Sequence, residues 1–183
     1  MATWRTLLSA IRRVQTEILW LDPSRDFGPK PHPGASLGAL RETEQRLGRP
    51  LPPSYRAFLA ESDGWPRFFE GATLLGTANL GLRLYADLVS AVFEAAETPV
   101  PDLGPPPRFP KKRPILIPFG VDLGATTLFA FNPTVATPSG EYEVICWVNE
   151  IGLRRESFED FLQMVLELCE CELEGQMLTY TAA

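Results

Sequence analysis

Apolar and polar residues recur along the chain at spacings that separate helical from extended segments. Apolar residues at intervals of three and four predict amphipathic helices within residues 1–20, 36–47, 52–62, 84–96 and 157–174. Short β-rich runs bounded by glycine, proline or polar residues predict strands at residues 68–69, 73–75, 115–119, 128–131 and 141–148. The elements together predict an α+β fold, with a mostly antiparallel sheet of about five to six strands and helices packed on it.

The clearest start and stop signals lie in residues 36–65. Ser36 is a suitable N-cap for one helix, and Gly48 is a suitable residue to end it. Pro53 fits the first turn of a second helix, because the amide that proline lacks has no partner there. Gly64 stops that helix. The sequence therefore predicts two amphipathic helices joined by a tight corner rich in proline.

The same stretch carries a longer motif, E-x-x-L-G-x-x-L-P-x-x-Y-x-x-F-L-x-x-S-D-G, which begins at Glu44. This motif resembles the opening segment of the SUKH superfamily. That superfamily groups yeast cell-wall-synthesis regulators of the Smi/Knr kind with bacterial immunity proteins. The later patterns PFG-x-D-x-G-x-x-x-L-x-A-F-N, from Pro118, and SFEDFLQMVLE, from Ser157, are also similar to it. The resemblance extends over residues 35–168, and it implies the superfamily's α+β fold.

The hairpin departs from the superfamily pattern at one position. A Gly-Asp dipeptide commonly occupies this turn in the superfamily, whereas Gly124 is followed by Ala125 here. Asp122 lies in the same loop and could supply a carboxylate instead.

Composition and charge narrow the class of protein. The 183 residues are 45% hydrophobic and 22% charged, which is typical of one globular domain spanning 1–183. The formal net charge is −6, which argues against nucleic acid as a partner because phosphate binding needs a basic surface. A negative charge suits a basic protein partner, although it also keeps many cytosolic proteins soluble.

Cysteine and hydropathy patterns give expectations about compartment and cofactors. Cys146, Cys169 and Cys171 are odd in number, which favours reduced thiols over a disulfide framework. With His32 as the only histidine, the sequence predicts neither a metal site nor a cofactor. No apolar run approaches the roughly twenty residues that cross a bilayer, and charged residues interrupt the N-terminal segment. We therefore expect a cytoplasmic protein without a membrane partner.

Catalytic signals are lacking in the sequence. His32 lies between prolines, where no neighbouring residue offers a nucleophile. Glu159 and Asp160 are adjacent on a predicted helix, so their side chains point apart and cannot act on one substrate. No nucleophile elbow, zinc-protease motif or Walker sequence is present. A non-catalytic binding domain is the prediction.

The resemblance implies a specific form of binding: an immunity protein that covers the active site of a toxin, often a nuclease, in the cytoplasm. Acidic residues at turns and strand ends are candidates for contacting a basic toxin domain, namely Asp63, Asp122, Glu141, Glu143 and Glu150. Aromatic residues could anchor the same interface, namely Trp65, Phe68 and Phe69. Each residue also has a structural interpretation, as a turn former or as part of the core. We expect a monomer or a weak dimer.

Other interpretations remain open from the sequence. The chain could be a regulatory or scaffold domain of the cell-wall-regulator kind without a toxin partner. It could instead bind a small ligand in a pocket lined by Trp65 and Trp147. Residues 99–114 are rich in proline and carry four cations, which predicts an extended surface loop that is either solvated or in contact with an acidic ligand.

Overall fold

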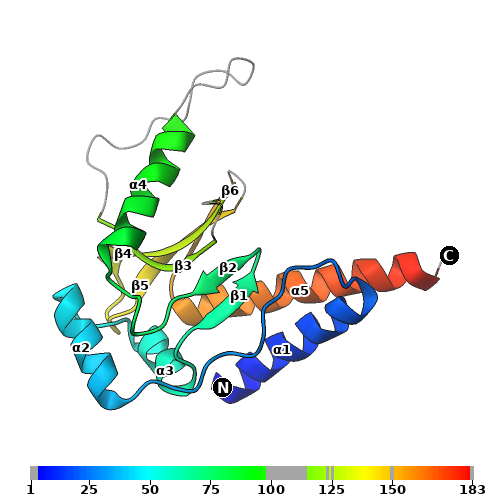
Figure 1. Ribbon diagram of the computed structural model, residues 1–183, viewed down its shortest axis with the longest axis horizontal. Coiled ribbons are helices and arrows are strands. Elements are labelled where there is room, and N and C mark those ends of the chain that lie inside the picture. Colours follow the sequence, from blue (N-terminus) through cyan, green and yellow to red (C-terminus); the bar gives the residue numbers. More distant parts are fainter. Residues whose placement is uncertain (1–3, 98–114, 123, 125, 149–150, 182–183) are drawn as a thin grey trace.

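The computed structural model describes residues 4–97, 115–122, 124, 126–148 and 151–181 (Figure 1). Its helices are α1 (Trp4–Leu21), α2 (Leu37–Leu47), α3 (Pro53–Glu61), α4 (Arg83–Glu97) and α5 (Phe158–Thr181). Its strands are β1 (Trp65–Phe69), β2 (Ala72–Leu74), β3 (Ile117–Val121), β4 (Thr127–Ala136), β5 (Tyr142–Val148) and β6 (Ile151–Arg155). The predicted proline-rich loop, 99–114, lies outside the described residues.

The strands form one sheet in the order β1-β2-β3-β4-β5-β6, and every pair is antiparallel. Each strand therefore pairs with its neighbours in the chain. The α+β fold with a mostly antiparallel sheet is confirmed, and its six strands fall within the predicted range. The sequence signals did not identify β6, which pairs with β5 from Val144↔Arg155 to Val148↔Ile151.

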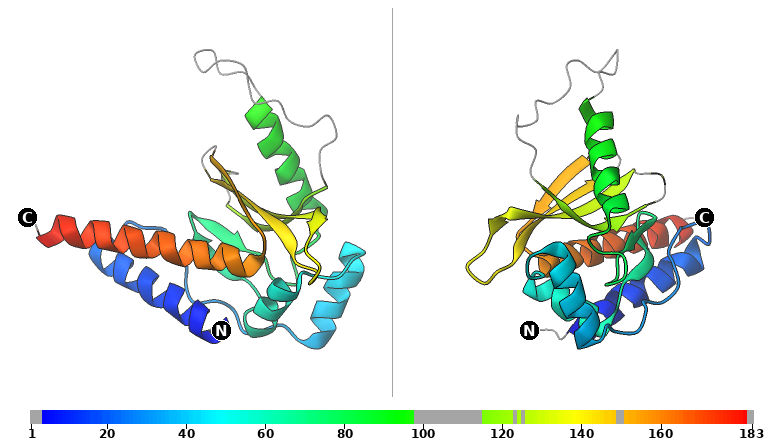
Figure 2. Two further views of the ribbon diagram at one scale, coloured as in Figure 1. Left: turned by 180° about the vertical axis from the view of Figure 1, so that it is seen from behind. Right: turned by 60° about the vertical axis from the view of Figure 1, so that its left-hand side comes forward.

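The helices cover the two faces of the sheet unequally (Figures 1 and 2). Helices α3 and α5 lie against one face, with α1 beside α5, whereas α4 rises from the opposite face. The main core forms under α3 and α5, where aromatic rings from several elements meet. Phe119 and Phe131 stack with centroids 4.2 Å apart, and Tyr55 meets Phe158 edge-on at 4.7 Å. A smaller apolar cluster lies under α4.

The predicted helix signals act as expected at both ends of α2. The Ser36 hydroxyl accepts a hydrogen bond from the amide of Ala39, and Gly48 adopts the left-handed conformation with φ of 66°. Apolar spacing was less accurate on this helix. The spacing of Leu37, Leu40 and Leu47 predicts one apolar face, yet Leu40 is buried whereas Leu37 is 63% exposed. Leu37 is the first residue of α2 and follows the N-cap directly.

Candidate protein-binding face

Glu141, a predicted partner-binding residue, caps a helix that is distant in sequence. Its carboxylate accepts hydrogen bonds from the Ser54 amide at 2.8 Å and from the Ser54 hydroxyl at 2.6 Å. Ser54 lies in the first turn of α3, and Pro52 at the N-cap has no side-chain acceptor to offer. The turn between β4 and β5 therefore supplies the missing cap. This structural contact occupies both oxygens of Glu141.

Asp63 and Asp122 organise turns through similar contacts. The Asp63 carboxylate accepts hydrogen bonds from the amide and hydroxyl of Thr77, at 2.5 and 2.8 Å. The Asp122 carboxylate accepts from the amides of Gly124 and Thr127, at 3.0 and 2.8 Å. Both residues therefore hold the loops that follow α3 and β3, which is the structural interpretation considered for them above. Glu150 lies outside the described residues.

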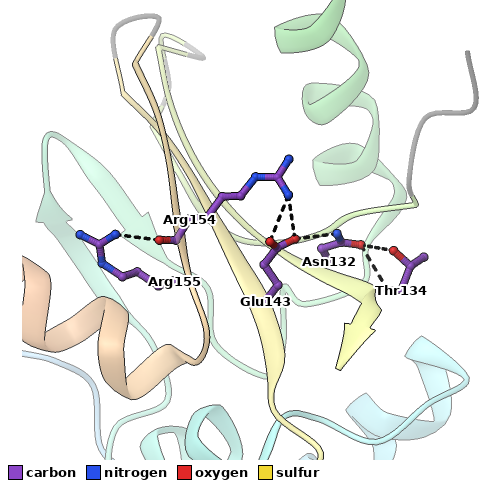
Figure 3. A network of polar contacts seen from close by, with 5 residues as sticks. All are labelled: Asn132, Thr134, Glu143, Arg154 and Arg155. Atoms are coloured by element: carbon purple, nitrogen blue, oxygen red, sulfur yellow. Dashed lines mark hydrogen bonds and ion pairs between the residues drawn. The ribbon is translucent and has the colours of Figure 1, made fainter. Parts of the chain in front are cut away.

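Glu143 lies on the outer face of β5, the side of the sheet from which α4 rises (Figure 3). Its carboxylate accepts from the Asn132 amide at 2.8 Å and pairs with Arg154 at 3.0 Å. The Glu143 side chain is only 15% exposed, whereas that of Arg154 is 70% exposed. Asn132 in turn accepts the hydroxyl of Thr134 at 2.6 Å. The charge of Glu143 is therefore already balanced, and the cation is the group that faces solvent.

The predicted aromatic anchors belong to the core. Trp65 and Phe68 have no exposed surface, and Phe69 is almost completely buried. Trp65 and Phe68 pack edge-on with centroids 5.0 Å apart, on the face of β1 that the helices cover. A ring without exposed surface cannot contact a partner in this conformation, so Trp65 and Phe68 are not surface anchors here. The proposed ligand pocket lined by Trp65 and Trp147 is also wrong, because Trp147 packs against the separate cluster under α4.

Helix α5 carries the whole net charge of the chain. The sequence holds 23 acidic and 17 basic residues, and six of the acidic residues but none of the basic ones lie in α5. The remainder of the chain therefore has 17 of each and is neutral. Most of these carboxylates are exposed: Glu159, Asp160, Glu167, Glu170 and Glu174. From the sequence, Glu167, Glu170, Glu172 and Glu174 are interpreted only as the solvated side of this helix. A count of charge by element identifies the helix as the source of the net charge.

An apolar pocket of about 330 Å³ lies between α5 and the sheet. Its walls come from β1, β4, β5, β6 and α5, together with the residue that follows β1, and they comprise Phe69, Glu70, Phe129, Cys146, Val148, Leu153, Met164, Leu168 and Glu172. Leu153 and Leu168 are 40% and 44% exposed, so two large apolar side chains stand partly in solvent at this pocket. Sequence reasoning missed the pocket because its lining residues come from five separate elements.

Two carboxylates of this pocket share one guanidinium. The Arg25 Nε lies 2.8 Å from Glu172, and its Nη2 lies 3.7 Å from Glu70. The three side chains are between one quarter and about one third exposed. Two carboxylates therefore face one guanidinium here, and the charge of Arg155 on β6 also acts on Cys146 in the pocket wall.

Two of the three thiols, those of Cys146 and Cys169, are buried, whereas that of Cys171 is exposed. Burial raises the pKa of Cys146 to about 12 and the pKa of Cys169 to about 12, so both thiols are protonated at neutral pH. The His32 Nδ1 lies 3.3 Å from the backbone carbonyl oxygen of Asp63. Within the described ranges, no three histidine, cysteine or carboxylate groups gather as a metal site would require. No helix there is long and apolar enough to cross a membrane.

The fold and this face define a class of protein: a six-stranded antiparallel meander covered on one face by helices, with an acidic helix beside an apolar pocket. The chain belongs to the SMI1 / KNR4 family (SUKH-1), whose family model matches residues 34–164. This confirms the resemblance noted from the sequence motifs. No individual curated protein matches the chain significantly.

Proposed function

We propose that this chain is a non-catalytic protein-binding domain that acts in the cytoplasm as an immunity protein and neutralises a toxin with a basic surface. The supporting observation is the concentration of the entire net charge on α5. Membership of the SMI1 / KNR4 family supports the domain type. The partner surface expected from this charge is cationic, as in the substrate groove of a nuclease.

The distribution of charge over the surface affects the association of a basic partner more than the total charge does. A net charge of −6 spread over the surface would attract a basic partner weakly in every orientation. Because these charges lie on one helix, they attract such a partner toward one face and raise the association rate. Salt screens these interactions over about 8 Å at physiological ionic strength. We therefore expect association to slow as salt is added.

The functional experiment is co-expression with the C-terminal domain of a toxin encoded beside this chain. Rescue of growth and formation of a stable one-to-one complex are the expected results. If this domain neither forms a complex with the chain nor is neutralised by it, the immunity proposal is wrong, and the regulatory alternative is then favoured.

A matched pair of variants tests the role of α5. E167Q/E174Q removes two exposed carboxylates from α5, whereas E42Q/D87N removes two exposed carboxylates from α2 and α4. Both variants have the same net charge. Stopped-flow association at low salt is expected to slow at least roughly threefold for the α5 variant. Equal slowing by both variants would show that only the total charge matters.

A further inference from the structure

We propose that the pocket between α5 and the sheet receives one large apolar side chain of the protein partner, and that a lysine or arginine next to it in the partner meets the carboxylates beside the pocket. This inference rests on the proposed function and specifies the chemistry of the partner. It predicts a two-part recognition element: an apolar anchor and an adjacent cation.

The pocket has the size and surface of an anchor site. A volume of about 330 Å³ lies near the lower limit of ligand pockets, which run from roughly 300 to 1,000 Å³. This favours a single side chain over an extended ligand. Phe129, Cys146 and Met164 are buried residues of the pocket, and they belong to three different elements of the main core. Because that framework is rigid, the pocket is formed before a partner arrives, which reduces the entropy lost on binding.

The partly exposed leucines mark the part of the pocket that would contribute most to the binding free energy of an occupant. Leu153 from β6 and Leu168 from α5 are both exposed by about two fifths. Exposed apolar surface contributes to binding when a partner removes it from water. A leucine, methionine or phenylalanine side chain between them would bury both at once. Such a buried apolar anchor within a ring of peripheral contacts is typical of protein interfaces.

The charge around the pocket favours a basic residue next to that anchor in the partner. Glu70 and Glu172 share Arg25, and Arg155 also acts on the pocket wall at Cys146, so the excess negative charge beside the pocket comes from the other carboxylates of α5. Asp160 precedes Met164 by four residues and Glu167 follows it by three, so both are its neighbours on the helix surface. A partner with an acidic residue beside its anchor would be repelled here, whereas a basic residue would be attracted.

The described residues of the opposite face of the sheet show a different arrangement of charge. There the Glu143 carboxylate is mostly buried and paired with Arg154, whose guanidinium faces solvent (Figure 3). That arrangement would favour an acidic group, in contrast to the charge of α5. Within the described residues, the pocket beside α5 combines apolar surface with the negative charge of that helix.

A pair of small probes tests the chemistry of the pocket without any partner. Octylammonium and octanoate each contain eight carbon atoms and carry opposite charges, and titration of each is followed by NMR on the labelled full chain. We expect octylammonium to shift resonances of the residues lining the pocket and to bind at least about fivefold more tightly than octanoate. Equal affinity of the two probes, or no shift at these residues, would overturn the inference.

Variants that fill the pocket test whether the partner binds there. L153W and L168W each place an indole at the pocket from a partly exposed position, and L84W adds the same ring to an exposed position on α4. Two filling variants are used so that a folding defect in one leaves the other informative. We expect both to abolish octylammonium binding and to weaken the toxin complex at least about tenfold. L84W should leave both within about twofold of the original chain.

The probe titration and the pocket-filling variants together separate failure of the inference from failure of the proposed function. If the original chain binds the toxin and the filling variants bind it equally well, the pocket is not the anchor site, although the immunity function stands. If the probe binds in the pocket but the original chain does not bind the toxin, the proposed function fails and this inference fails with it. Octylammonium binding would then show a small-ligand site instead.

Discussion

The contact between Glu141 and Ser54 makes a quantitative prediction about stability. Helix α3 begins with two prolines, so the first amides that need an acceptor follow them. Glu141, 87 residues further along the chain, supplies that acceptor with two short hydrogen bonds to Ser54. The variant E141A removes the acceptor and leaves the Ser54 amide and hydroxyl without it in a buried position.

The expected cost follows from the two bonds that are lost. Loss of a helix cap costs about 0.5–2 kcal/mol, and a hydrogen bond to a charged group contributes about 1.5–3 kcal/mol. Because Glu141 is partly exposed, water compensates part of this loss. We expect E141A to lower the free energy of unfolding by about 2 kcal/mol, which corresponds to a decrease of about 4–8 °C in Tm for a chain of this length. E141Q keeps one acceptor oxygen and should cost about half as much.

Urea unfolding followed by circular dichroism measures this difference. The control is E170A, which removes an exposed carboxylate from α5 and should change stability by less than about 0.5 kcal/mol. A double-mutant cycle with S54A isolates the pair, since E141A should cost less when the hydroxyl is already absent. The capping argument is refuted if E141A is no more destabilising than E170A, or if the two mutations E141A and S54A are fully additive.

Three further predictions follow from the buried thiols and from one glycine. With Ellman's reagent at pH 8, we expect the exposed Cys171 to react within seconds and the buried Cys146 and Cys169 to react only after denaturation; rapid reaction of three thiols in the folded chain would contradict this. The pKa values of these two thiols are about 12 in the folded chain, against an ordinary value of 9.0. The unfolded chain therefore loses thiol protons first as the pH rises, and stability measured by urea unfolding should fall from about pH 9 upward; a flat profile between pH 9 and pH 11 would contradict the burial argument. A Cβ at Gly28 would lie 1.9 Å from a backbone carbonyl oxygen of β1, whereas a Cβ at Gly175 meets open space, so calorimetry should show a clear loss of Tm for G28A but not for G175A; equal Tm values would show that the backbone at Gly28 can move.

Local signals predicted the helices well. Ser36 and Gly48 determine the ends of α2 through contacts within a few residues, and Ser157 caps α5 through the amide of Asp160 at 3.1 Å. Strand β6 was not identified, because its sequence, Ile-Gly-Leu-Arg-Arg, has no clear alternation of apolar and polar residues. It becomes a strand by pairing with β5, which is a tertiary interaction.

The binding face was harder to predict than the fold. Aromatic residues in a short strand are equally consistent with a core and with an interface, and Trp65 became core because helices cover that face of β1. The role of Glu141 depends on a residue far away in the sequence. The charge of α5, in contrast, depends only on which residues the helix includes. A count of charge by predicted element would have identified it without a structure.

The meander order has a consequence for how this architecture can diversify. Four of the five connections between successive strands are short, whereas residues 75–116, 42 in number, intervene between β2 and β3. Closing a chain segment becomes costlier only with the logarithm of its length, so a twofold extension there adds about 0.6 kcal/mol. We therefore expect this segment to tolerate changes in length while both halves of the sheet keep their pairing, provided that α4 still covers the smaller apolar cluster.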